Sequence, residues 1–145
     1  MSESIKDLKG FFASIRGDIN QLNLLIAQFE RQYELLSNRD GKQLPDLNDK
    51  MLTLLDELRL SNQGREQYLK QLGLPGDKEG LKMLQAKLPT PTRNQVANLL
   101  KEISLKVQTC NMMNERAGKL LACQRNIMTQ LGNLKNQQAY PDFRA

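Results

Sequence analysis

Apolar residues recur at alternating steps of three and four along the first quarter of the chain, without a single break. This series consists of Ile5, Leu8, Phe12, Ile15, Ile19, Leu22, Ile26, Phe29, Tyr33 and Leu36. The spacing predicts a long α-helix that presses one narrow stripe against another helix. A second series, from Leu44 to Leu72, is polar only at Ser61 and Arg65. Such long series favour a helical bundle, a class that more often binds other proteins than catalyses reactions.

Turn and cap residues divide the chain into helices over about 4–37, 45–72, 77–88 and 91–136, followed by a loose tail over 137–145. Gly73 suits the end of the second helix, because a helix often ends at a glycine that adopts a positive φ. Asp77 suits the start of the short third helix, since its carboxylate can accept a hydrogen bond from a free backbone N–H. We therefore expect one all-α domain over 1–145. Its architecture is an elongated antiparallel bundle of three long helices plus one short connector helix, with left-handed, coiled-coil-like packing.

Composition argues against an enzyme. Histidine is absent, which removes the commonest general base and the commonest metal ligand. No glycine-rich phosphate loop and no metal-ligand spacing occur, so we expect no cofactor and no metal. No apolar run reaches the roughly 20 residues that span a bilayer, so we expect no stable membrane insertion. Cys110 and Cys123 are too far apart on one helix to form a disulfide, and free thiols indicate the cytoplasm.

Positive charge is concentrated in the last long helix. Residues 87–136 hold eight lysine and arginine residues but only two acidic residues, Glu102 and Glu115. This segment therefore accounts for the formal net charge of +5 that the whole chain carries. This asymmetry could steer an acidic partner toward the helix. The basic residues are spread out and are not interleaved with aromatic residues, so we expect no nucleic-acid binding.

The last helix has a second apolar row beside its main stripe. At heptad spacing this row contains Met113, Leu120, Ile127 and Leu134. One interpretation is that the short helix covers part of the last helix near 96–110. A second is dimerisation or packing in the core. A third, which we favour toward the carboxyl terminus, is that the row stays unshielded and binds a partner protein, because methionine-bearing rows adapt to different shapes.

Three further stretches of the chain are informative when taken together and in order. They are the hairpin turn at Arg39-Asp40 with Leu44, Leu47, Lys50 and Leu54-Leu55; Arg65-Glu66-Gln67-Tyr68-Leu69 with Leu72-Gly73-Leu74, Asp77 and Gly80-Leu81; and Met113-Asn114-Glu115-Arg116-Ala117-Gly118-Lys119-Leu120-Leu121. Together they resemble the FlgN-type flagellar export chaperones. The third stretch is similar to a family pattern of Asn-x-x-Asn-Gly followed by apolar residues, with Ala117 in place of the second asparagine. The family's usual Tyr-x-x-x-Gly tail reads Tyr140-Pro141-Asp142-Phe143-Arg144 here and lacks the glycine.

The resemblance implies a cytoplasmic chaperone that binds the terminal helices of flagellar hook-associated proteins and delivers them to the export apparatus. It implies that the client is bound by Met113, Asn114, Gly118, Lys119, Leu120, Arg125, Ile127 and Leu134. By position, Tyr140 is the residue expected to dock to the export gate, although it could instead fold back on the bundle. The alternative is a self-associating coiled-coil adaptor, and a weak homodimer is left open.

Overall fold

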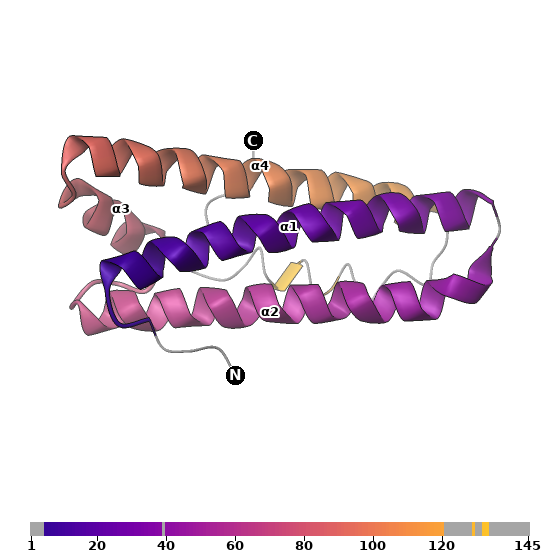
Figure 1. The fold of residues 1–145 in the computed structure, drawn as a ribbon, viewed down its shortest axis with the longest axis horizontal. Coiled ribbons are helices and arrows are strands. Elements are labelled where there is room, and N and C mark those ends of the chain that lie inside the picture. The colour runs from indigo at the N-terminus through magenta and orange to yellow at the C-terminus, as the bar shows by residue number, and fades with distance from the viewer. Residues whose placement is uncertain (1–4, 39, 121–128, 130–131, 134–145) are drawn as a thin grey trace.

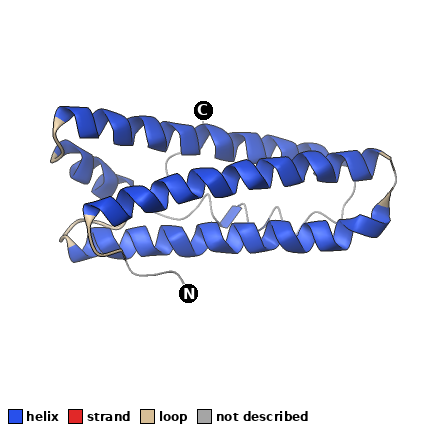
Figure 2. Ribbon diagram, in the orientation of Figure 1, coloured by secondary structure: helices blue, strands red, loops and turns tan. Residues whose placement is uncertain are grey.

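The computed structural model describes residues 5–38, 40–120, 129 and 132–133. Within these ranges the regular structure is all helical: α1 (Leu8–Ser37), a short 3-10 turn (Gly41–Gln43), α2 (Leu44–Gln71), α3 (Lys78–Ala86) and α4 (Thr90–Leu120). Figure 1 shows three long helices lying lengthwise beside one another, with α3 at one end. The predicted all-α bundle of three long helices and one short connector helix is confirmed. Figure 2 shows that the loops lie at the two ends of the bundle.

Helix α1 lies between the other two long helices. It packs against α2 and against α4, whereas α2 and α4 make no close backbone approach within the described residues. In Figure 1, α2 runs antiparallel to α1, and the short α3 reverses the chain so that α4 runs parallel to α1. Because α1 has a neighbour on each side, it must bury a wider face than a two-helix seam requires.

Helix ends follow local capping chemistry. Helix α1 begins at Leu8 and not near residue 4, because the Asp7 carboxylate accepts a hydrogen bond from the Gly10 N–H at 2.8 Å. Asp77 caps α3 as predicted, and accepts from the Gly80 N–H at 3.1 Å. Gly73, at the predicted end of α2, has a φ of +78°, a conformation that costs glycine little. The part of the predicted last helix beyond Leu120 falls almost wholly outside the described residues.

The core forms one continuous apolar cluster along α1. Its largest fully buried side chains include Phe11, Ile15 and Leu22 of α1, together with Leu58 of α2 and Ile103 of α4. The connector helix contributes Leu81 and Leu84 at its end of the bundle, and Leu88, two residues beyond the end of α3, is buried as well. Helix α3 packs against both α2 and α4. This contact agrees with the interpretation that the short helix covers the beginning of the last one.

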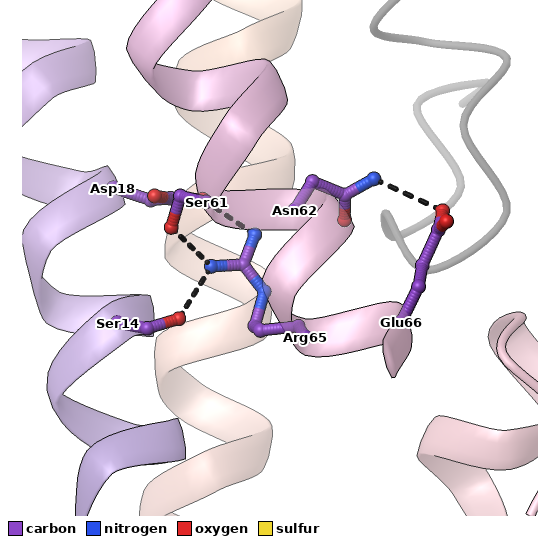
Figure 3. Close-up of polar contacts among 6 residues, drawn as sticks. All are labelled: Ser14, Asp18, Ser61, Asn62, Arg65 and Glu66. Carbon is purple, nitrogen blue, oxygen red and sulfur yellow. Dashed lines mark hydrogen bonds and ion pairs between the residues drawn. The ribbon is translucent and has the colours of Figure 1, made fainter. Parts of the chain in front are cut away.

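Polar side chains interrupt the core between α1 and α2 (Figure 3). Arg65 of α2 donates to the Asp18 carboxylate of α1 at 2.5 Å, and both side chains are at most 4% exposed. The same guanidinium donates to the hydroxyls of Ser14 at 2.7 Å and Ser61 at 3.0 Å. These bonds satisfy a charge that would otherwise be costly to bury. The two polar positions noted in the second apolar series, Ser61 and Arg65, thus belong to one network.

Candidate functional site

Helix α4 is the most basic of the three long helices. It carries five basic residues and two acidic ones, whereas α1 is balanced and α2 has one more acidic than basic residue. Two of the five cations contact other parts of the bundle. The Arg93 guanidinium donates to the carbonyls of Ala86, the last residue of α3, and of Leu88, which follows α3, and Arg116 lies against α1.

Arg116 joins α4 to the carboxyl-terminal part of α1. Its guanidinium carbon lies 3.7 Å from the centre of the Tyr33 ring, and its Nη2 is 3.9 Å from the Glu30 carboxylate. The ion pair is half exposed, so its net contribution to stability is at most about 1 kcal/mol. The contact therefore places α4 beside α1 without closing the solvent-facing side of α4.

The structure places the predicted client-binding residues on α4 in different environments. Met113 is only 8% exposed and belongs to the core, so the expectation that it is unshielded is wrong. It is buried because α4 turns two adjacent rows toward the bundle at this point, including Cys110 and Ala117. Gly118 is half-buried and Lys119 is exposed.

Asn114 is a polar side chain within the buried seam of α4. It is 3% exposed, and its side-chain oxygen makes no hydrogen bond to any described residue. An amide oxygen in such a place loses its hydration without full compensation, which weakens local packing. The buried face of α4 therefore contains, at Asn114, an amide oxygen without a hydrogen bond from any described residue, whereas at the middle of the helix it is lined by the apolar side chains Ile103 and Val107.

The remaining predicted site residues are Leu120 and four residues that follow it in the sequence. Leu120 ends α4, but its side chain is not among the described ones, and Arg125, Ile127, Leu134 and Tyr140 lie outside the described residues. The structure therefore brings together only Met113, Asn114, Gly118 and Lys119 over two turns of α4. For these residues, binding of a client stays a prediction.

Two exposed apolar residues of α4 were missed by the sequence analysis. Leu105 is 54% exposed and Met112 is 69% exposed. They belong neither to the main stripe nor to the predicted second row, but they lie seven residues apart and share one face of the helix. A search for short heptad pairs outside the longest apolar rows would have found them.

Burial also sets the chemistry of the described thiol. Burial raises the pKa of Cys110 to about 12, an effect that the nearby Lys106 partly opposes. A buried thiol with this pKa is a weak nucleophile at neutral pH.

In the described part of the chain, no group of three or more Cys, Asp or Glu side chains is arranged to hold a metal ion. Of the described helices, none has a segment both apolar and long enough to span a bilayer.

The fold defines a class: an elongated all-helical bundle in which one long helix, α4, is basic and exposes two apolar side chains. The sequence model of the FlgN family, described as FlgN protein, matches residues 1–141. The chain belongs to the FlgN family, which is a family of flagellar chaperones.

A solved structure shares this fold. It is a crystal structure described as that of a flagella synthesis protein FlgN from Pseudomonas aeruginosa, with a TM-score of 0.77 and 21% sequence identity. The match covers 89% of this chain and 98% of that chain. At this identity the likeness establishes the helical arrangement. Among curated proteins, none matches the chain significantly.

Proposed function

We propose that this protein is a cytoplasmic type III export chaperone that binds the terminal helices of flagellar hook-associated proteins. In this role it prevents premature assembly of the client and delivers it to the export gate. The observation that carries the proposal is the family match over residues 1–141. The basic charge of α4 supports it, because a positively charged helix attracts and orients an acidic partner.

The client would lie along the carboxyl-terminal part of the chain. Leu120, Ile127 and Leu134 would form the apolar row, with Lys119 and Arg125 beside it and Gly118 allowing close approach of the client backbone. Asn114 could supply its buried oxygen to a donor on the client once the seam opens. Met113 would support this surface from the core side. Burying three leucine or isoleucine side chains contributes roughly 4–9 kcal/mol before the costs of association.

Co-purification with a hook-associated protein tests the proposal. We expect a 1:1 complex with the unaltered chain, measured by light scattering after size-exclusion chromatography. Leu120→Asp and Ile127→Asp should each weaken the complex by at least about tenfold, because a carboxylate cannot be buried unpaired against a client helix. Leu24→Asp is the matched control, since Leu24 is 53% exposed on α1. Circular dichroism verifies that each variant keeps its helices.

Two outcomes would count against the proposal. A complex that survives both substitutions would exclude the apolar row as the client site. A dimer that persists at all dilutions and excludes the client would favour a self-associating adaptor instead.

We further propose that Tyr140 docks the loaded chaperone to the export gate. Tyr140→Ala should then leave client binding unchanged and lower the amount of hook-associated protein exported. If Tyr140 instead folds back on the bundle, the same substitution should lower the melting temperature without a specific loss of export.

A further inference from the structure

We propose that the outward face of α4, formed by Lys101, Leu105, Met112 and Lys119, docks an acidic amphipathic helix of a partner protein. This surface differs from the row Leu120, Ile127 and Leu134 assigned above to the client. The inference rests on the described residues of α4 and does not depend on the proposed export role.

Exposure and helical geometry define the apolar centre of this face. Leu105 and Met112 are 54% and 69% exposed. Seven residues make two turns, so the two side chains project within about 20° of each other, roughly 10 Å apart along the axis. They lie on the opposite side of α4 from the buried Ile103, Val107 and Cys110. The other strongly exposed large apolar residues among those described are Leu24, Leu72 and Met83, and these lie in three different segments.

Charge decides which occupant fits this face. Lys101 precedes Leu105 by one turn, and Lys119 follows Met112 by two turns, so a cation lies at each end of the apolar centre. Glu115, one turn before Lys119, is exposed at the edge of the same face, and the two lysines outnumber it, so the face keeps a net positive charge. Both lysines are exposed, and neither forms an ion pair with a described carboxylate. Their aliphatic stems can extend the apolar contact while the ammonium groups stay hydrated. The complementary surface is a helix with apolar residues at heptad spacing and aspartate or glutamate beside them.

Other occupants fit less well. A second copy of this chain that docked through the same face would bring Lys101 and Lys119 against their own equivalents, or against each other, and like charges disfavour this pairing. A nucleic acid would leave Leu105 and Met112 without a matching surface, because this face has no aromatic side chain on which bases could stack.

Fluorescence anisotropy with two synthetic peptides tests the proposal on the full chain. Both peptides are helical and of equal length, with leucine at heptad spacing, and they differ only in carrying glutamate or lysine at the flanking positions. We expect the acidic peptide to bind at least about tenfold more tightly than the basic one at low salt. Leu105→Ala/Met112→Ala should weaken the acidic peptide by about tenfold or more, because apolar burial is lost.

Matched variants separate this face from general surface effects. Leu24→Ala removes an equally exposed leucine from α1 and should leave peptide binding unchanged. Lys101→Glu should weaken the acidic peptide about threefold and strengthen the basic one, whereas Lys50→Glu on α2 should do neither. Alanine is the best helix former, so the double variant keeps α4 intact, which circular dichroism verifies.

Several results would overturn the proposal. They are equal binding of the two peptides, no binding of the acidic peptide, or an equal loss on Leu24→Ala. Tighter, substitution-sensitive binding of DNA or of vesicles containing anionic lipid would assign the face to those ligands instead. Failure of the export role appears separately, as a missing complex with the hook-associated protein, and these peptides do not report it.

Discussion

Helix α1 has two long neighbours, and the two contacts are built from different chemistry. Against α2, it buries a charged pair, Asp18 with Arg65, and joins Gln32 to Asn48 by a hydrogen bond of 2.8 Å. Helix α4 buries mainly apolar side chains in the shared core, and its ion pair with α1, at Arg116, is half-exposed.

The two contacts therefore differ in what they fix. The buried ion pair sets the register of α2 along α1, whereas apolar packing holds α4 against α1 without setting its register. A buried ion pair is satisfied only when its two partners meet, so sliding α2 by one turn along α1 would leave charges buried and alone. A seam of leucine, isoleucine and valine has no such penalty, since a shifted seam still buries apolar area. We infer that the hairpin of α1 and α2 is the registered part of the fold, and that α4 is held by volume and shape.

The largest expected effect tests the registered contact. Arg65→Met should lower the free energy of unfolding by about 3–5 kcal/mol, because it leaves the Asp18 carboxylate buried without a cation. Urea denaturation followed by circular dichroism measures this loss. The double variant Asp18→Leu/Arg65→Met should recover most of the stability, since both charges are then absent.

The control for this prediction is an exposed ion pair of α2. Arg59→Met breaks the ion pair between Arg59 and Asp56, whose side chains are 37% and 57% exposed. It should lower the free energy of unfolding by less than about 1 kcal/mol. If Arg65→Met costs no more than Arg59→Met, the buried pair does not register the hairpin, and the contrast between the two contacts of α1 disappears.

The next effect tests whether the apolar seam of α4 stays closed. With Cys123→Ser leaving one thiol, Cys110 should react with a water-soluble disulfide reagent about a thousandfold more slowly than free cysteine at pH 7. The reason is that burial raises the pKa of the thiol to about 12, so very little thiolate is present. Urea should restore the normal rate.

Alkaline pH provides a second measurement on the same group. The thiol ionises near its ordinary pKa in the unfolded chain and only near 12 in the folded one. The folded state therefore holds its proton more tightly, so this contribution to stability is complete below about pH 9 and is lost as pH rises toward 12. A reaction at the rate of free cysteine in the native protein would show that the seam of α4 is open.

The sequence predicted where the helices begin and end better than it predicted which of their faces are buried. The residues Gly73 and Asp77 act locally, so the end of α2 and the start of α3 followed from them. The buried face of α1 could not be anticipated in the same way. The apolar stripe includes Phe12, which is half-buried, and omits Phe11, which is fully buried. A helix with two neighbours buries residues on both sides of any single stripe.

Polar core residues explain most of the remaining difference. Asp18 and Gln32 occupy buried positions of α1 that no hydrophobic pattern would select, because their burial depends on partners about 47 and 16 residues away. The candidate site shows the same limit. Met113 was expected to be exposed because its row seemed to have no neighbour in the chain. Its burial in the core beside α1 depends on tertiary packing, which the spacing of apolar residues does not predict.

The smallest expected effect concerns the contact between α4 and α1 at Arg116. Arg116→Met should lower the free energy of unfolding by only about 0.5–1 kcal/mol, because methionine keeps contact with the Tyr33 ring while losing the cation and its pair with Glu30. Urea denaturation beside Arg65→Met measures both on one scale. Tyr33→Leu should then cost less in the Arg116→Met background than in the unaltered chain, since the two residues share one interaction that the first substitution has already removed. If Arg116→Met lowered the free energy of unfolding as much as Arg65→Met, a charged contact would fix the register of α4 as well. The proposed difference between the two contacts of α1 would then be wrong.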